Sequence, residues 1–186
     1  MKAVLLSIQP VWCSKIVLKE KTVEVRKTKP EGVKPPFKCY IYCTLPRYPH
    51  EDFIETDYPK PQFYGGGKVI GEFVCDWIYQ YSSADHLYGV DISHEDMARQ
   101  SCLTRKQIEA YELKNAPEEG YFYFGVFGWH ISNLKIYDVP RELASLTGLR
   151  ATRFGAAPYD IKRAPQSWCY VEEREHDAPA HPEKTK

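Results

Sequence analysis

Six short stretches of apolar or alternating residues constrain the fold of this chain more than any other feature. They lie at 3–8, 22–28, 38–44, 68–81, 120–137 and 167–172. Apolar runs and runs with a two-residue period are typical of β-strands. Fourteen prolines, which disfavour helix interiors and central strands, break the chain between and around them. The pattern predicts a fold dominated by strands, with Gly71 as a bulge in the long stretch that contains it.

Two regions have helical spacing instead. Pro10 suits the first turn of a short helix that places Trp12 and Ile16 on one face. Residues 83–116 carry acids and bases at helical spacing, and Thr104 suits an N-cap. Together these elements predict an α+β protein with flanking short helices and a helical insertion. A small mixed β-barrel is the economical architecture, because closure leaves no long exposed sheet edge.

The length of the chain suits one main domain. We expect residues 1–173 to form it, with the helical insertion (83–116) packed against the side of the barrel. Residues 174–186 contain charged residues and prolines but no large apolar side chain, which predicts a disordered tail. Residues 138–165 are predicted to be turns and a basic loop, and residues 45–67 an irregular excursion.

Charge and cysteine usage exclude several classes of protein. Basic and acidic side chains number 25 each, so no overall field favours nucleic acid or a lipid surface. The six cysteines form no C-x-x-C pair and most lie in apolar runs, which predicts reduced, mostly buried thiols in a cytoplasmic protein. The six histidines are scattered, so we expect no metal and no cofactor. No apolar run approaches the ~20 residues of a membrane span.

The segment Glu20–Lys27, EKTVEVRK, places charged side chains along one side of a strand. Glu24 and Arg26 are two residues apart and share a face with about 7 Å between them, while the valines beside them face the core. A solvated strand face with cross-strand ion pairs is the simplest interpretation. The alternative is a ligand site in which Lys21 and Arg26 hold an anion, while Glu24 accepts a hydrogen bond or activates water.

The charge around this strand is locally unbalanced. Between Cys13 and Lys38 there are eight basic and three acidic residues, so this segment carries +5 in a chain whose net charge is zero. A basic cluster on one segment is typical of a protein that contacts a phosphate backbone. A plain solvated surface is the competing interpretation.

The segment Arg163–Tyr170, RAPQSWCY, is a second candidate for ligand contact. It places a base, an amide and a tryptophan directly before a strand. Trp168 offers a ring on which a base can stack, Gln166 an amide for a base edge, and Arg163 a cation for a phosphate. The alternative is that Trp168 closes the end of a barrel.

Taken together, these motifs resemble the ASCH superfamily, whose domain has a PUA-like β-barrel. The pieces that carry the resemblance are LSIQP, a short helix with Trp12 and Lys15, KTVEVR at 21–26, KVIGEFVCD and RAPQSWCYVEE. They cover most of residues 3–173. The chain is also similar to ASCH proteins of bacterial and prophage genomes that are often labelled transcriptional regulators.

The resemblance implies a cleft between the first helix and the barrel that binds RNA or a nucleotide-like ligand. The residues predicted to bind the ligand, from the motifs and the resemblance together, are Trp12, Lys15, Lys21, Glu24, Arg26, Arg163, Gln166 and Trp168. DNA and free modified nucleosides are alternative ligands, and the oligomeric state is left open. A separate hypothesis is an interaction protein whose helical insertion contacts a partner.

Some small members of the superfamily are amidohydrolases that act on acetylated cytidine with a Lys, a Thr and a Glu. Lys21 matches the lysine, but the threonine position falls at Glu24, and Lys19 stands where the family usually has a glycine that closes the helix. The alternative function is therefore an amidohydrolase or a ribonuclease with Lys21 and Glu24 catalytic. Arg26 on the same face suits Glu24 to holding a ligand rather than taking a proton, so binding is the favoured prediction.

Overall fold

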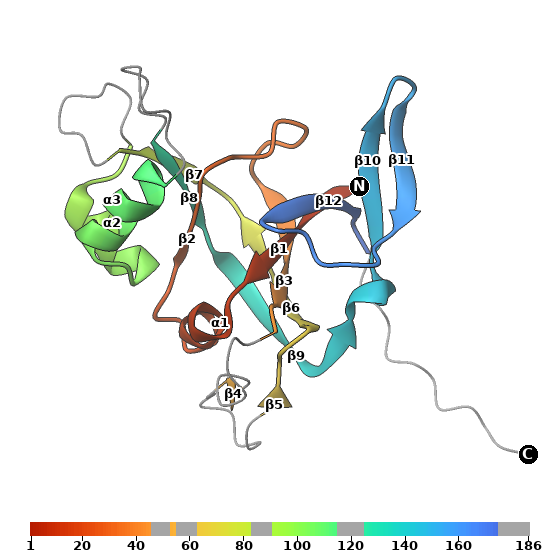
Figure 1. Cartoon of the computed structure of the whole chain (residues 1–186), viewed down its shortest axis with the longest axis horizontal. Coiled ribbons are helices and arrows are strands. Elements are labelled where there is room, and N and C mark those ends of the chain that lie inside the picture. Colours follow the sequence, from red (N-terminus) through yellow and green to blue (C-terminus); the bar gives the residue numbers. More distant parts are fainter. Residues whose placement is uncertain (46–52, 55–62, 83–90, 115–124, 175–186) are drawn as a thin grey trace, which may run out of the picture.

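The computed structural model describes residues 1–45, 53–54, 63–82, 91–114 and 125–174 (Figure 1). Two main β-sheets and three α-helices make up this part of the chain, so the predicted α+β class is confirmed. Residues 175–186 of the predicted tail and both ends of the predicted helical insertion lie outside the described residues. None of the helices in these ranges has the length and apolar character needed to span a bilayer.

The larger sheet has seven strands in the order β11-β10-β12-β1-β3-β6-β9. Their bounds are β1 Lys2–Ile8, β3 Phe37–Cys43, β6 Lys68–Cys75, β9 Ser132–Glu142, β10 Thr147–Thr152, β11 Gly155–Asp160 and β12 Trp168–Glu172. β1 lies at the centre, parallel to β3 and antiparallel to β12. Its position explains the unbroken apolar run in its sequence, because Ala3 through Leu6 are fully buried on both faces of the sheet.

The smaller sheet has three strands in the order β2-β8-β7, with bounds β2 Val23–Arg26, β7 Ile78–Tyr81 and β8 Val126–His130. Along the described strands, the chain passes between the two sheets four times, and two of the passages are very short: Asp76 and Trp77 link β6 to β7, and Ile131 links β8 to β9. The single strands predicted over 68–81 and 120–137 are therefore wrong. Each is two strands in different sheets, and the link at Asp76 is fixed by the hydrogen bond between Asp76 Oδ1 and His130 Nδ1, at 2.6 Å.

The predicted bulge lies beside Gly71, where Ile70 is left out of the register. The pairing of β6 with β9 shifts register between Val69 and Gly71, and its pairing with β3 shifts at the same place. A Cβ atom at Gly71 would lie 2.5 Å from the carbonyl oxygen of Lys135, so any side chain would force the strands apart. The bulge prediction is confirmed.

Three apolar clusters cover the faces of the two sheets. The first lies between the sheets, where Leu6, Ile41 and Trp129 pack with side chains of the helix α1 (Pro10–Val17). The second covers the other face of the larger sheet, against the segment that leads into β10. The third packs the outer face of the smaller sheet against α2 (His94–Ser101) and α3 (Arg105–Leu113). As a result, β2 has packed structure on both of its faces (Figure 1).

The helices α1 and α3 begin where the sequence predicts. α1 starts at Pro10, and α3 has the capping box of Thr104 and Gln107. All six cysteines are free thiols, and four of them are buried, as predicted.

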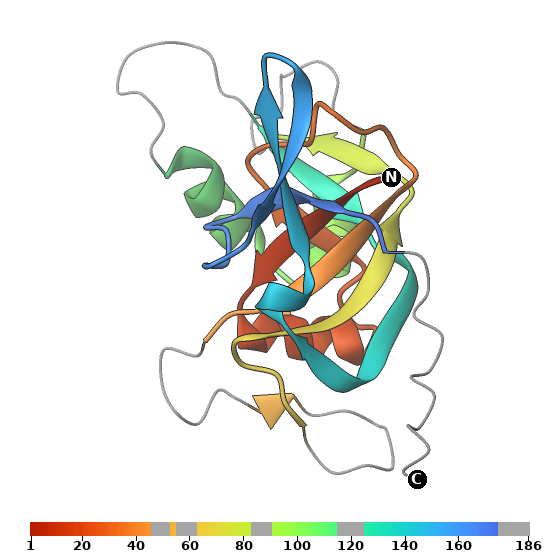
Figure 2. The ribbon, with the colours of Figure 1, turned by 90° about the vertical axis from the view of Figure 1, so that its right-hand side faces the viewer.

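Residues 138–165 were predicted to be turns and a basic loop, and this is wrong. β9 runs on to Glu142, and β10 and β11 then form an antiparallel hairpin in register from Thr147–Asp160 to Thr152–Gly155. The hairpin extends beyond the rest of the larger sheet in both ribbon views (Figures 1 and 2). Its outer half is exposed on both faces, so its sequence lacks the apolar alternation by which strands are recognised.

The excursion at 45–67 is described only in part. β4 (Phe53–Ile54) and β5 (Phe63–Tyr64) pair in a two-stranded sheet, and most of the remaining excursion lies outside the described residues.

Candidate ligand-binding site

The charged side chains of β2 and of the turn before it are buried. Lys21, Glu24 and Arg26 are 2%, 6% and 8% exposed. They are enclosed because the neighbouring valines of β2 pack against α2 and α3, which turns the Glu24 side of the strand towards β1 and the larger sheet. A solvated strand face is excluded, because these three side chains have almost no contact with solvent.

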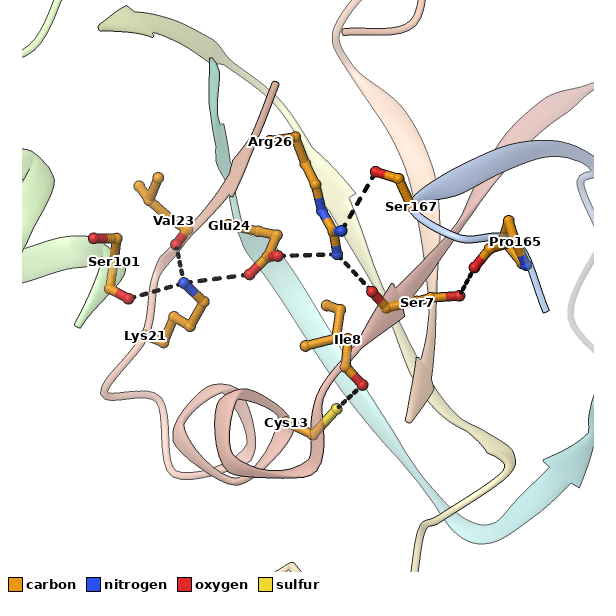
Figure 3. A network of polar contacts seen from close by, with 10 residues as sticks. All are labelled: Ser7, Ile8, Cys13, Lys21, Val23, Glu24, Arg26, Ser101, Pro165 and Ser167. Atoms are coloured by element: carbon orange, nitrogen blue, oxygen red, sulfur yellow. Dashed lines mark hydrogen bonds and ion pairs between the residues drawn. The ribbon is translucent and has the colours of Figure 1, made fainter. Parts of the chain in front are cut away.

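Lys21 uses all of its donors inside the protein. Its Nζ donates to the carbonyl oxygens of Val23, at 2.9 Å, and Ser101, at 2.8 Å, and forms an ion pair with Glu24 Oε2 at 3.2 Å (Figure 3). An ammonium group has three donors, so the set is complete. Ser101 is the last residue of α2, where the helix dipole favours a cation. Lys21 therefore fastens β2 to the end of α2.

Glu24 is held between two cations. Its other oxygen, Oε1, lies 3.0 Å from Arg26 Nη2, which also donates to the carbonyl oxygen of Ser7 at 2.8 Å. Ser7 Oγ in turn donates to the carbonyl oxygen of Pro165, at 2.6 Å, and Arg26 Nη1 lies 3.5 Å from Ser167 Oγ. Figure 3 shows the resulting chain of contacts from α2 through β2 and β1 to the segment before β12. We call Lys21, Glu24 and Arg26 the buried triad.

Two donors, one in the triad and one beside it, have no hydrogen-bond partner within the described ranges. They are Arg26 Nε and Trp129 Nε1, both buried. Trp129 is paired with Glu24 across β2 and β8, so the two side chains project from the same face of the smaller sheet.

A pocket of about 370 Å³ opens beside the triad, at the end of α1. Its lining combines cationic, polar and apolar side chains: Ile16, Lys19, Lys21, Thr22, Ile131, Asn133 and Leu134. Lys19 and Asn133 are exposed and adopt left-handed backbone conformations, with φ of 60° and 48°. The stem of Lys21 forms part of the wall while its ammonium group points into the triad.

Two further predicted residues lie on α1 near the triad. Trp12 is half-buried, and its ring centroid lies 5.4 Å from Lys21 Nζ. Lys15 pairs with Glu20 at 3.0 Å on the surface, and the hydrogen bond and charge of Glu20 raise the pKa of Lys15. The structure brings Trp12 to the triad, whereas Lys15 is engaged with Glu20.

The remaining predicted residues lie on the approach to β12 and in the strand itself. Trp168 Nε1 donates to Thr28 Oγ1 at 2.9 Å, and its ring centroid lies 6.0 Å from that of Trp129. The indole is therefore packed and hydrogen-bonded, although it remains half-exposed. Arg163 and Gln166 are exposed on the segment before β12.

Sequence reasoning missed the polar residues that complete the site. Ser7 and Ser167 lie inside the motifs LSIQP and RAPQSWCY, but a lone serine carries no chemical signal of its own. Asn133 offers a weak signal, because asparagine tolerates the left-handed conformation that it adopts here. Across the described residues, no group of three histidine, cysteine, aspartate or glutamate side chains gathers into a possible metal site.

Comparisons with known proteins identify the fold. No protein-family model matches the sequence, and no curated protein matches it. Among solved structures, the chain is similar to two single-substitution variants of ZmASCH from Zymomonas mobilis. The first has 14% sequence identity and a TM-score of 0.50, covering 93% of this chain and 92% of that one. The second has 15% identity and a TM-score of 0.51, covering 92% and 89%. The fold that the motifs predict is therefore confirmed: this chain has the PUA-like fold of the ASCH domain.

Proposed function

We propose that the protein binds RNA or a nucleotide-like ligand in the pocket at the end of α1. The observation that supports this most is the lining of the pocket, in which the cation of Lys19 and the amide of Asn133 lie beside an apolar wall. A nucleotide presents the matching set of an anionic phosphate, polar base edges and a flat ring. The ASCH fold agrees with a ligand of this class.

The buried triad holds the pocket in shape rather than contacting the ligand through its charges. All three donors of Lys21 are occupied, and both oxygens of Glu24 already face cations. Ligand sites are most effective when a second layer of hydrogen bonds fixes the residues that line them. The triad provides that layer, because it fixes Lys21 in the wall and joins β2 to α2 and β1.

Hydrolysis by Lys21 and Glu24 is the alternative, and the geometry favours it less. A general base must reach the proton that it removes, and a catalytic lysine needs a free amine or a donor that faces the substrate. Here Glu24 and Lys21 face each other instead, at 3.2 Å. We therefore expect no turnover of acetylcytidine or RNA by the wild-type protein. Turnover above background would favour hydrolysis over binding alone.

The basic segment around β2, between Cys13 and Lys38, attracts an anionic ligand electrostatically. Lys27 and Lys29 lie over the rings of Tyr111 and Phe127, at 5.4 and 5.1 Å from the ring centroids. These contacts hold two cations at the surface beside aromatic rings, the combination used by proteins that bind single-stranded nucleic acid. Four buried free cysteines also fit a reducing compartment such as the cytoplasm.

Glycine substitutions test the pocket without strain. Lys19→Gly and Asn133→Gly remove a pocket side chain at positions where the backbone already has positive φ. Calorimetric titration with uridine and cytidine monophosphates at low salt should give affinities weakened about fivefold or more in each variant, as expected for the loss of one charged or polar contact.

Cys102→Gly is the matched control, because Cys102 also has positive φ, at 57°, and does not line the pocket. It should bind as the wild type does. Equal affinities for the wild type and both pocket variants would place the ligand elsewhere and overturn the proposal.

A further inference from the structure

We infer that the hairpin of β10 and β11 is a second contact for nucleic acid, an arm that stacks an unpaired base on Phe154 and meets phosphates with Arg150 and Arg153. This inference rests on the proposed function, because both require a nucleic-acid ligand. It adds a surface remote from the pocket and commits to a single-stranded polynucleotide.

The hairpin is anchored at its base and free beyond it. β10 pairs with β12 through Gly148 and Leu149, opposite Val171 and Tyr170. The ring of Tyr159 covers Gly148 so closely that a Cβ atom there would lie 2.4 Å from it. Three residues of β10 extend past this anchor, a reach of about 10 Å at about 3.3 Å per residue. The two views show this outer half standing away from the body (Figures 1 and 2).

The tip of the hairpin is a built turn that displays an aromatic ring. Thr152 Oγ1 donates to the carbonyl oxygen of Gly155 at 2.7 Å and accepts from the backbone amide of Phe154 at 3.2 Å. Gly155 supplies the positive φ, 115°, that closes the turn. Phe154 is 86% exposed, and the guanidinium of Arg153 lies 4.5 Å from its ring centroid. The turn therefore holds a large apolar ring in solvent beside a cation.

The charge around the hairpin selects the kind of partner. Residues 147–163 contain four basic residues and one acidic residue, so this segment carries +3 in a chain whose net charge is zero. Bases stack on aromatic rings and on arginine planes whatever their sequence, while the arginines neutralise phosphates. The deep, narrow major groove of an RNA duplex would not admit such a ribbon, and the exposed ring of Phe154 suits an unpaired base, so the inference commits to single strands.

The hairpin lies on the same side of the molecule as the basic loop between β2 and β3 (Figures 1 and 2). Tyr170 joins the two, because it is paired with Leu149 at the base of the hairpin and its hydroxyl accepts from the backbone amide of Gly32 at 2.7 Å. Lys2 Nζ lies 5.4 Å from the centroid of the same ring. A strand that contacts the hairpin would therefore meet further cations as it crosses the body.

Fluorescence anisotropy with labelled oligouridylate of about 12 nucleotides, a length within the usual range of single-strand sites, tests the arm in the full chain. Phe154→Ser should weaken binding about 5- to 100-fold, the usual effect of removing one stacking platform. Arg150→Ser combined with Arg153→Ser should lower the slope of log affinity against log salt by about 1.4. The same oligomer made of DNA distinguishes contact with the 2′-hydroxyl from contact with the bases and phosphates that both polymers share.

Two matched variants control for loss of exposed side chains of the same kind. Val139→Ser removes an apolar side chain that is 75% exposed, and Arg99→Ser an arginine whose side chain is 72% exposed. Both should bind oligouridylate as the wild type does. All hairpin variants should keep the wild-type affinity for uridine monophosphate, which belongs to the pocket.

The outcomes separate this inference from the proposed function. If the wild type binds uridine monophosphate and the hairpin variants bind oligouridylate unchanged, the arm is overturned while the pocket stands, and Phe154 is left as a contact for a protein partner. If the wild type binds neither ligand, both proposals fail. Selective loss of oligonucleotide binding in the hairpin variants supports the arm.

Discussion

At the scale of single residues, the buried triad is the feature with the largest energetic consequence. Removing three charges from water is costly, and Glu24 offsets that cost by facing a cation with each of its oxygens. Spacing in the sequence correctly placed Glu24 and Arg26 on one face of a strand. It could not show that a second sheet covers that face, because burial depends on partners far along the chain, such as Ser7 and Ser167.

Neutralising Glu24 should therefore destabilise the protein strongly. Glu24→Gln leaves Lys21 and Arg26 buried without a counter-charge, and we expect it to lower the free energy of unfolding by about 3–5 kcal/mol, measured by urea denaturation. Glu20→Gln is the control, since its pair with Lys15 is on the surface and should contribute no more than about 1 kcal/mol. Similar small losses in both variants would contradict a structural role for the triad.

At the scale of secondary-structure elements, α1 shows how a local requirement can be anticipated from the sequence. The family resemblance places a glycine at the position of Lys19, and the structure gives the physical reason, because the residue closes the helix with a φ of 60°. The hairpin of β10 and β11 shows the opposite case. Its strands are held by pairing with each other and with β12, and non-local pairing of this kind leaves little trace in the sequence when neither face is buried.

The pocket variant Lys19→Gly should be more stable than the wild type while it binds ligand less well. Relief of the left-handed conformation gains about 1–2 kcal/mol, and the added freedom of the unfolded chain returns about 0.4–1 kcal/mol, so we expect a net gain of about 0.5–1 kcal/mol. Thermal unfolding with and without nucleotide measures both effects. Lys15→Gly, within α1, should instead lose about 1 kcal/mol. A destabilised Lys19→Gly would show that its side chain, rather than its backbone, stabilises the end of the helix.

At the scale of the whole molecule, strands that bend from one sheet into the other join three apolar layers into one body. Periodicity along the chain predicted the α+β class, and the short motifs predicted the fold, because both depend on local spacing. Two of the points at which the chain changes sheets, Asp76–Trp77 and Ile131, were not predicted, since each is set by contacts between distant segments such as the hydrogen bond of Asp76 with His130.

The buried thiols make the stability of this body sensitive to alkali. Burial raises the pKa of Cys75 from its usual value of 9.0 to about 12, and burial also raises that of Cys13 and Cys39. Above pH 9 the unfolded thiols lose protons that the folded ones keep, so the unfolded state binds fewer protons and stability falls. The stabilisation is complete below pH 9 and is lost as the pH rises through about 12, by at most about 4 kcal/mol for Cys75 alone.

Urea midpoints measured at several pH values between about 8 and 11 test this, within the range in which these thiols ionise when unfolded. The wild type should lose stability steadily above pH 9, and Cys75→Ala should show a shallower decline from a lower starting value. A decline of equal steepness in Cys75→Ala would assign the alkaline sensitivity to other groups, such as Tyr137, whose pKa is raised by burial and by its hydrogen bond to Glu72.

The buried triad also limits how this sequence can diverge. Replacing Glu24 alone leaves two buried cations without a counter-charge, and replacing Lys21 or Arg26 alone removes the donor to buried carbonyl oxygens, so each first step away from the present set passes through a less stable intermediate. Apolar residues of similar volume can replace such a set without loss, but only when all of its members change together. We therefore expect the residues at positions 21, 24 and 26 to be substituted together or not at all as the sequence diverges.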